Sequence, residues 1–568
     1  MAIVNAPDSC VYVALSYCWG KSWHFVCTRE NHGVLSLSGA LASVPLPNTI
    51  QDAIAVTNAM QIRYLWVDAL CITQDDVDML QSQIPHMDSI YGSAALTIIA
   101  ASGDNANSGL PGVQVGSRYV IADILRFKSL NLMLCPPDFD NIGVQQSTWR
   151  SRAWTMQEEL FSARKLYFTP DRMVWSCERA YWSEHESREP SSRSKCVAIA
   201  PRVDSNEPRL PESTSTNDYD FDTYRGLVEA FSVRQMGSPS DSLNAFAGIE
   251  RYLFASGGHQ VVWGHPQMWF TRSLQWEMNY ETDEHHEMHR LSSSDGSTHL
   301  VQFPSWSWSA WGRKTEPNTV YWIGVPSDED HIKDHEPLLY FYECSKNGWK
   351  RRLDEQSDRQ RNTHRDSQRT ILPDWDAFPV EWVSSFLPDP IGFRRHEKLP
   401  SSISAPWRES PLTIDPSQDP VSGSWDVSCG HLKFWSSVGT IYLHRRPKIV
   451  AGRPWDYTIL NQHGKTISHT INMQANNHME WLDKSNCKAY PPLTVPQDEA
   501  EGLVFDAVVI GMQKPSRGSG ESGLRNPNYI KALLIERIDG IAYRRGLVSI
   551  AEDEWIGLER KWMLVTLG

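Results

Sequence analysis

YVALSYCWG, residues 12–20, predicts a buried β-strand that ends in a turn. The strand part, taken as Val11–Tyr17, is rich in β-branched and aromatic residues, and Trp19-Gly20 ends it. Two later apolar runs, Tyr64–Ile72 (YLWVDALCI) and Ala95–Ala101 (ALTIIAA), have the same character. The three runs are therefore expected to be neighbouring strands of one largely parallel sheet.

Helical patterns separate these strands. One helix is predicted after Asn48, where Thr49 and Asp52 form a T-x-x-D start signal. A second helix is predicted from Asp75 onward, because apolar residues recur three and four positions apart. Pro85 lies inside the second helix and predicts a break there, since proline removes one backbone hydrogen bond.

A third helix is predicted over Arg152–Ser162, followed by a strand or hairpin at Leu166–Cys177. Strands that alternate with helices indicate a parallel sheet with helices on its faces. We therefore expect residues 11–180 to form an α/β domain of this kind.

The remainder of the chain divides by composition. Residues 181–222 are rich in Ser, Glu, Pro, Arg and Asp, and are interpreted as a linker. Residues 223–312 are interpreted as a helical, Trp-rich segment, in which Tyr224–Leu253 and Trp263–Tyr280 are helical. Residues 313–425 are expected to be irregular or poorly ordered.

The C-terminal region, residues 426–568, is predicted to be β-rich. Asp539-Gly540 predicts a hairpin between two of its strands. The predicted strands are Leu432–Trp435, Val438–Leu443, Val504–Met512, Ile530–Ile538, Tyr543–Ile550 and Met563–Leu567.

Composition excludes several classes of protein. The net charge of −14 over 568 residues argues against broad nucleic-acid binding, which needs a basic surface. The ten cysteines include no C-x-x-C pair, so free thiols are expected rather than disulfides or a paired-cysteine zinc site. The N-terminus lacks the pattern of a signal peptide, and the apolar stretch Ala94–Ala101 is too short to span a bilayer. We therefore expect a cytoplasmic protein with no membrane span, no nucleic-acid partner and no metal.

Two motif-like strings are discounted. Gly518, Gly520 and Gly523 form a G-x-G-x-x-G string, but a dinucleotide site needs a helix after it, and Tyr529–Ile535 predicts a strand. A flexible hairpin loop is expected there. The string DEHHEMH at residues 283–289 lacks the H-E-x-x-H order of a zinc site and is expected to be a solvated loop.

Polar and aromatic residues gather where two of the predicted strands end. Asp68 lies near the carboxyl end of a predicted central strand, and Ser16, Tyr17 and Trp19 lie at the equivalent end of the first strand. Ligands of open α/β sheets bind at those ends, so these four residues are candidates for binding. A structural alternative stays open, in which Asp68 caps a helix or bonds a loop and the other three pack a turn.

Three sequence blocks stand in order along the first third of the chain: YVALSYCWG at Tyr12–Gly20, LWVDALCITQ at Leu65–Gln74, and RAWTMQEELFSAR at Arg152–Arg164. Together they resemble the fungal heterokaryon-incompatibility (HET) domain family. That domain is similar to the TIR signalling fold, so the resemblance implies a TIR-like parallel sheet flanked by helices. It also implies a signalling effector of non-self recognition and programmed cell death, which acts through oligomerisation of the HET domain driven by a sensor or partner.

The resemblance also singles out Glu158. Many TIR domains carry a W-C-x-x-E-L helix whose Glu acts in NAD cleavage. Trp154 and Glu158 stand at the same interval here, although Thr155 replaces the Cys and a second Glu precedes the Leu. The resemblance therefore implies Glu158 as a catalytic carboxylate, supported by Trp154, with NAD as substrate and no bound cofactor. A non-catalytic adaptor is the alternative, in which Glu158 is an exposed helical residue or pairs with Arg152 or Arg164.

Overall fold

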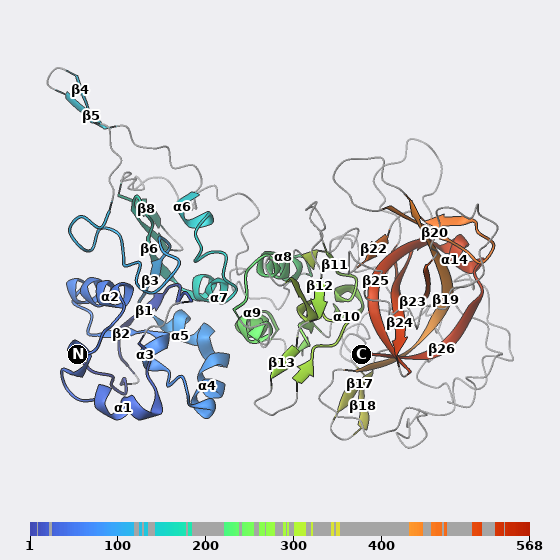
Figure 1. The fold of residues 1–568 in the computed structure, drawn as a ribbon, viewed down its shortest axis with the longest axis horizontal. Coiled ribbons are helices and arrows are strands. Elements are labelled where there is room, and N and C mark those ends of the chain that lie inside the picture. Colours follow the sequence, from blue (N-terminus) through green and yellow to red (C-terminus); the bar gives the residue numbers. More distant parts are fainter. Residues whose placement is uncertain are drawn as a thin grey trace, which may run out of the picture. The chain divides into compact units, whose positions relative to one another are not determined.

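A computed structural model of the chain divides it into two units, unit 1 (residues 1–216 and 230–253) and unit 2 (residues 217–229 and 254–568) (Figure 1). The structure describes residues 1–7, 9–21, 25–118, 124–127, 130–133, 142–177, 180–184, 221–237, 241–254, 261–266, 269–278, 288–290, 292–294, 300–313, 320–321, 342–345, 348–352, 431–446, 456–468, 471–473, 503–513, 529–538 and 540–568.

Unit 1 is built on a six-stranded sheet of order β2-β1-β3-β6-β7-β8. The first four strands in this order run parallel, and Val13 of the second lies between Leu65 and Leu96 of its neighbours. The three N-terminal apolar runs are thus neighbouring parallel strands, as predicted. The parallel strands are β2 (Tyr64–Trp66), β1 (Tyr12–Ser16), β3 (Leu96–Ala100) and β6 (Arg164–Phe168).

The second strand is shorter than predicted and lies at the edge of the sheet. β2 ends at Trp66, and the short helix α3 (Asp68–Cys71) begins after Val67. The predicted strand Tyr64–Ile72 thus combines a strand with a helical turn, because a short apolar run does not distinguish the two. The prediction that Asp68 follows a central strand was wrong, since β2 pairs with β1 alone among the described strands.

Antiparallel strands extend the other side of the sheet. β6 and β7 (Met173–Cys177) form the predicted hairpin, and β8 (Ala180–Ser183) pairs with β7. β4 (Ile124–Phe127) and β5 (Leu130–Met133) make a separate two-stranded ribbon.

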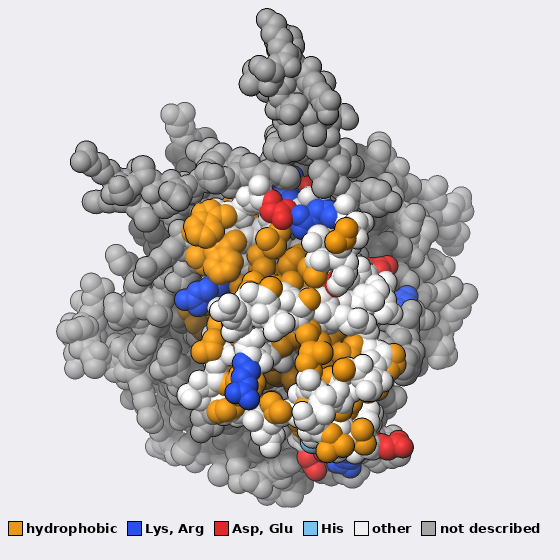
Figure 2. Space-filling model, turned by 90° about the vertical axis from the view of Figure 1, so that its left-hand side faces the viewer, with side chains coloured by type: hydrophobic (Ala, Val, Ile, Leu, Met, Phe, Trp, Pro, Cys, Tyr) orange, Lys and Arg blue, Asp and Glu red, His pale blue; other side chains and the backbone are white. Residues whose placement is uncertain are grey.

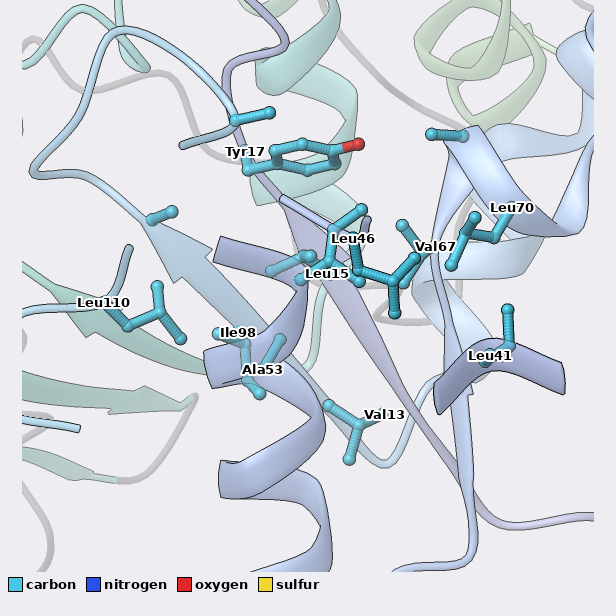
Figure 3. Close-up of a cluster of buried hydrophobic side chains, with 14 of the residues drawn as sticks. Val13, Leu15, Tyr17, Leu41, Leu46, Ala53, Val67, Leu70, Ile98 and Leu110 are labelled. Carbon is cyan, nitrogen blue, oxygen red and sulfur yellow. The ribbon is translucent and has the colours of Figure 1, made fainter. Parts of the chain in front are cut away.

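Helices cover both faces of this sheet (Figure 1). Successive residues of a strand point to opposite faces. Val13 and Leu15 of β1 pack against α2 (Asn48–Ala59) in one core cluster, in which Ala53 and Ile98 also lie (Figure 3). Ala14 packs on the other face, beside Tyr91 of α5 (Met87–Ser93). Both faces of β1 are therefore buried, which explains its continuous apolar sequence.

The remaining described helices of the first 160 residues lie around this core. Pro85 interrupts the second predicted helix as expected: α4 ends before it, a 3-10 turn contains it, and α5 follows. Asp76 caps α4 by accepting a hydrogen bond from the backbone N–H of Met79 at 3.1 Å. These elements are α1 (Arg29–Leu35), η1 (Ala40–Ala42), α4 (Val77–Gln83), η2 (Ile84–His86), α6 (Ile142–Gln145) and α7 (Trp154–Phe161).

The predicted T-x-x-D start signal does not cap α2. The helix begins at Asn48, after Pro47, so Thr49 and Asp52 lie inside its first turns. Asp52 instead accepts a hydrogen bond from the backbone N–H of Leu110 at 2.8 Å, and Thr49 accepts one from the N–H of Gly109 at 3.1 Å. The two side chains therefore hold the loop that follows β3.

Trp66 and Trp154 were expected to be mostly buried, and both are partly buried. They pack at the border of the cluster around Ala14 and Tyr91. The rings of Trp66 and Tyr91 meet edge to face, with centroids 5.5 Å apart.

Part of the chain returns to unit 1 after residue 229. α8 (Phe221–Ser232) crosses from one unit to the other, and α9 (Asn244–Phe254) ends at the boundary. Within unit 1, Gln157 of α7 accepts a hydrogen bond from the N–H of Gly248 at 3.0 Å, and Arg251 forms an ion pair with Asp88 of α5 at 3.0 Å. Residues 230–253 are thus fastened to α5 and α7.

The prediction of a helix over Trp263–Tyr280 was wrong. The segment instead contains short strands and one helical turn, because Gly264 adopts a left-handed conformation (φ +86°) and Pro266 cannot donate a backbone hydrogen bond. The elements are β9 (Val261–Val262), β10 (His265–Pro266), α10 (Phe270–Ser273) and β11 (Glu277–Met278). Further short strands follow: β12 (Met288–Arg290), β13 (Ser292–Ser294), β14 (Leu300–Gln302), β15 (Trp311–Arg313), β16 (Val320–Tyr321), β17 (Tyr342–Ser345) and β18 (Gly348–Arg352).

The C-terminal region is β-rich, as predicted. Its ten-stranded sheet joins β17 and β18 to eight later strands, and Leu432–Trp435 and Val438–Leu443 form one long strand instead of two. The predicted hairpin connects β24 and β25, with Gly540 left-handed at φ +83°. The later strands are β19 (Leu432–Arg446), β20 (Asp456–Leu460), β21 (Thr466–Ser468), β22 (Ile471–Met473), β23 (Leu503–Gln513), β24 (Tyr529–Ile538), β25 (Ile541–Ala551) and β26 (Arg560–Leu567), and α14 (Glu552–Ile556) precedes the last.

Several predicted features fall outside the described residues. They include the G-x-G-x-x-G string, the histidines of residues 283–287, most of the linker at 185–220, and residues 353–425. In the part that is described, no helix is long and apolar enough to cross a membrane, and no group of three or more His, Cys, Asp or Glu side chains could hold a metal. Five of the described cysteines are free thiols: Cys10, Cys18, Cys27, Cys71 and Cys177.

Candidate functional site

Glu158 lies at the centre of a buried polar cluster. It projects from α7 toward Ser16, the last residue of β1, whose hydroxyl donates a hydrogen bond to its carboxylate. The indole N–H of Trp149 donates to the same hydroxyl at 2.6 Å. Glu158 is 7% exposed, and Ser16 and Trp149 are fully buried. Glu158 and Ser16, both predicted as candidate site residues, are thus hydrogen-bonded neighbours. Glu158 is not an exposed helical residue, which was the alternative.

Burial changes the ionisation of Glu158. The pKa of the carboxyl is raised from 4.5 to about 7, first by burial and also by the negative charge of Asp68. Hydrogen bonding to Ser16, the positive charge of Arg152 and hydrogen bonding to Tyr91 oppose this rise. Glu158 is thus poised to exchange a proton near neutral pH, a property that clusters at functional sites.

The residues next to Glu158 on α7 point elsewhere. Glu159 forms an ion pair with Arg150 at 2.6 Å and accepts a hydrogen bond from the hydroxyl of Tyr167 at 3.0 Å. The positive charges around it lower its pKa despite its burial. Gln157 faces α9. Since successive helical residues point about 100° apart, Glu158 alone of the three faces β1.

Asp68 is tied to the turn after β1. Its carboxylate accepts a hydrogen bond from the indole N–H of Trp19 at 2.8 Å and another from the backbone N–H of Ala69 at 2.7 Å. Asp68 is the first residue of α3 and bonds the turn after β1, which is the structural role that was the alternative to binding. Its negative charge also raises the pKa of Glu158. Asp68 and Trp19 are both partly exposed and lie at the border of the cluster.

The hydroxyl of Tyr17 is buried and makes no hydrogen bond of ordinary geometry in the described part of the chain, although the carboxylate of Asp68 lies close enough to interact with it. The ring is 4% exposed, and it lies above the apolar side chains of Leu15 and Leu46 (Figure 3). Burial raises the pKa of Tyr17 well above its ordinary value, and the nearby charge of Asp68 adds to this. A buried polar atom without a hydrogen bond of ordinary geometry is uncommon in proteins and marks a position where a ligand atom could bind.

Three members of the cluster were not predicted from the sequence. Trp149 and Tyr91 reach it from segments whose sequence gave no sign of a site, and the hydroxyl of Tyr91 donates to the carbonyl of Leu15 at 3.0 Å. Arg152 was considered only as a partner of Glu158, but its guanidinium donates to the carbonyl of Tyr17 at 3.2 Å. In contrast, Trp154 packs in the apolar cluster around Tyr91, and no contact with Glu158 is seen.

Strand order explains why these residues meet. β1 is the strand from which the parallel sheet continues in both directions, to β2 on one side and to β3 on the other. A position where the strand order of a parallel sheet reverses is a topological switch point. It leaves a crevice at the carboxyl ends of the strands, where ligands of α/β proteins bind. Ser16 and Tyr17 stand at that end of β1.

Comparison with known proteins identifies the region that contains this cluster. Residues 12–158 match the sequence model of the family described as heterokaryon incompatibility protein (HET). The chain carries a HET domain. Over 106 residues, or 17% of its length, it is 30% identical to heterokaryon incompatibility protein 6, OR allele, of Neurospora crassa. The matched part spans 15% of the length of that relative. No solved structure matches the chain.

The limits of the HET match coincide with the limits of the site. The match begins at Tyr12, the first residue of β1, and ends at Glu158. It contains every member of the cluster: Ser16, Tyr17, Trp19, Asp68, Tyr91, Trp149, Arg152 and Glu158. The end of α7, the hairpin β6–β7 and residues 230–253 lie beyond it and support the HET domain from outside.

Proposed function

We propose that this chain is an effector of heterokaryon-incompatibility type, which arrests growth or kills the cell when its HET domain self-associates or is assembled by a sensor partner. The match over residues 12–158 and the similarity to a Neurospora crassa incompatibility protein support this role. The parallel sheet with helices on both faces also suits a TIR-like fold, the likeness from which assembly is inferred.

A second candidate function is cleavage of NAD at the bond between nicotinamide and ribose. The observation that favours it is Glu158, a buried carboxyl with a pKa of about 7 at the carboxyl end of β1. The buried hydroxyl of Tyr17 and the part-exposed Trp19 and Asp68 lie around it and offer groups for a ring and for ribose hydroxyls.

The chemistry requires one well-placed carboxylate. The bond between the nicotinamide nitrogen and ribose C1′ breaks, and its electron pair leaves with nicotinamide, which departs neutral. Positive charge develops on the ribose, and ionised Glu158 stabilises it, as carboxylates do in glycoside hydrolysis. A water molecule then adds to C1′ and releases its proton to Glu158 or to solvent, which yields ADP-ribose.

The deciding experiment measures growth arrest and NAD loss together. Wild type and Glu158→Gln are expressed in fungal hyphae, with and without a fused domain that forces dimerisation. Purified proteins are assayed in parallel for release of nicotinamide and ADP-ribose. Growth arrest that depends on dimerisation supports the effector role.

The Glu158→Gln arm separates the two candidate functions. Loss of both arrest and NAD cleavage in this variant, with unchanged circular dichroism, supports the enzyme. Arrest without NAD loss, retained in Glu158→Gln, supports an adaptor. Hyphae that grow normally with the dimerised wild type would contradict the effector proposal itself.

A further inference from the structure

We infer that Arg152 binds a phosphate group of the substrate, so that the HET site takes a phosphate-bearing nucleotide in preference to the corresponding nucleoside. The inference rests on the proposed cleavage of NAD. It assigns to one residue the recognition of the anionic part of that molecule.

The first observation is that Arg152 has no acidic partner within ion-pair distance among the described residues. Other partly buried arginines of unit 1 do have one: Arg118 pairs with Glu184, Arg150 with Glu159, and Arg251 with Asp88. Arg152 is partly buried as well. A guanidinium that has lost part of its hydration without gaining a carboxylate favours an anionic ligand.

The second observation is the position of the guanidinium. The guanidinium donates a hydrogen bond to the carbonyl of Tyr17, which holds it at the carboxyl end of β1. The hydroxyl of Tyr17 itself makes no hydrogen bond of ordinary geometry. The guanidinium also interacts with the thiol of Cys18. A guanidinium has five N–H donors, so these two contacts leave donors for a bidentate bond to phosphate.

The third observation is that the site carries charges of both signs. Glu158 and Asp68 carry the acidic side, where Trp19 is bonded to Asp68 at 2.8 Å. Arg152 supplies the positive charge near them, and that charge lowers the pKa of Glu158. NAD has the complementary pattern, with a cationic nicotinamide ring at one end and a diphosphate further along. Carboxylates that repel phosphate and attract the ring, together with Arg152, orient such a molecule in one direction.

The test compares NAD with nicotinamide riboside, which has the same scissile bond but no phosphate. In Arg152→Gln, we expect the KM for NAD to rise at least tenfold with kcat within about threefold of wild type. The kcat/KM for nicotinamide riboside should fall at least tenfold less than that for NAD, because loss of the Arg152 charge raises the pKa of Glu158 for both substrates but removes a phosphate contact only for NAD. Arg152→Lys, which keeps the charge but loses the bidentate fork, should give an intermediate KM for NAD. Arg164→Gln is the matched control and should match wild type, because Arg164 is exposed and donates a hydrogen bond to the carbonyl of Ala95, away from the site.

Two further measurements keep the inference separate from the proposed cleavage. Binding of NAD to Glu158→Gln and to the double variant Glu158→Gln/Arg152→Gln is measured by calorimetry, and the double variant should bind at least tenfold more weakly. If the double variant binds NAD more weakly but wild type does not cleave NAD, phosphate binding by Arg152 is supported and the proposed NAD cleavage is refuted. Sodium phosphate alone should inhibit wild type competitively if the site accepts free phosphate, and should not inhibit if it needs the nucleotide. An equal loss with NAD and with nicotinamide riboside, or no binding of NAD at all, would overturn the inference.

Discussion

At the scale of single residues, the alternation of β1 determines what Glu158 meets. Ser16 follows Leu15, so its hydroxyl points to the opposite face, toward α7. There it accepts from Trp149 and donates to Glu158, which satisfies polar groups that are otherwise costly to bury. The carboxylate is therefore fixed in place without an ion pair.

The first prediction concerns the pH dependence of stability. Because folding raises the pKa of Glu158 from 4.5 to about 7, the folded state holds this proton more tightly than the unfolded state. The stabilisation is complete below about pH 4.5 and is lost as the pH rises through 7. As the pH rises from 5 to 8, ionisation of Glu158 should lower the free energy of unfolding by roughly 2–3 kcal/mol.

Glu158→Gln isolates this contribution, since it keeps the size and removes the ionisation. Urea titrations at pH 5 and pH 8 give the free energy of unfolding of both proteins. From pH 5 to pH 8, the variant should gain roughly 2–3 kcal/mol of stability relative to wild type. If the free energy of unfolding changed equally in the two proteins from pH 5 to pH 8, Glu158 would have an ordinary pKa.

The second prediction concerns Ser16→Ala. The change removes a donor to Glu158 and the acceptor for the indole of Trp149, so it should cost about 1–3 kcal/mol of stability. Because the hydrogen bond from Ser16 lowers the pKa of Glu158, the acid limb of any NAD cleavage should move to higher pH. Ser38→Ala, at an exposed serine, should change stability by less than about 0.5 kcal/mol. An unmoved acid limb would show that Ser16 does not tune Glu158.

At this scale the sequence predicted the members of the site that belong to short motifs, and not those that depend on tertiary contacts. Glu158 and Ser16 were expected near each other, and they are hydrogen-bonded. Trp149 and Tyr91 belong to no motif, since each reaches the cluster by the way its own segment packs. No local pattern distinguishes such aromatic residues from ordinary core residues.

At the scale of elements, α7 is held by two neighbours that follow it far along the chain. Arg234 lies 3.8 Å from the carboxylate of Glu159, and Gly248 of α9 donates its N–H to Gln157. A Cβ atom on Gly248 would overlap the Gln157 side chain and would lie 2.7 Å from the Cβ of Asp88. α9 therefore approaches α7 and α5 at a distance that only glycine permits.

The third prediction follows from this close approach. Gly248→Ala should destabilise unit 1 by about 1–3 kcal/mol, because the added methyl group forces α9 away from the helix that carries Glu158. Gly226→Ala in α8 is the matched control: no atom lies within 4 Å of its added Cβ, and alanine suits a helix better than glycine. Denaturant midpoints should fall for Gly248→Ala and stay level or rise for Gly226→Ala. Equal effects at the two glycines would refute the tight contact.

Elements were predictable from sequence where periodicity was long and unbroken. Strands β1 and β3 of unit 1 and strands β24 and β25 of the C-terminal sheet were predicted at nearly their observed places. Trp263–Tyr280 was not, since its aromatic residues pack in short irregular pieces whose spacing imitates a helix over a few positions. Thr49 and Asp52 fit a capping signal but bond a distant loop, a contact that depends on the tertiary fold.

At the scale of the whole molecule, the two sheets have separate hydrophobic cores. The clusters around the sheet of unit 1 contain residues of unit 1 alone (Figure 3), and those around the ten-stranded sheet contain residues of unit 2 alone. On the face of the molecule seen in Figure 2, hydrophobic side chains lie in several patches, with a few charged side chains between them. The HET match, residues 12–158, lies within unit 1.

Arg544 is the residue on which the last prediction depends. It is 1% exposed in unit 2, where its guanidinium lies 3.7 Å from the ring centroid of Trp276 and donates to the carbonyls of Leu274 and Trp276. These contacts fasten β25 to the segment after α10. Replacement by methionine keeps the length but removes the donors and the cation–π contact, and should cost about 3 kcal/mol.

Because the two cores are separate, we expect differential scanning calorimetry of the full chain to resolve two transitions. Arg544→Met should lower the transition of unit 2 by several degrees and leave that of unit 1 in place. Glu158→Gln should act on unit 1 alone: from pH 5 to pH 8 the transition of unit 1 should fall less in the variant than in wild type, since the variant has no carboxyl to ionise there. α8 contributes residues to both units and is the element through which the transitions could become coupled. A single transition that both variants move would show that α8 joins the units into one cooperative structure, and a change in the second unit would then reach the helix that carries Glu158.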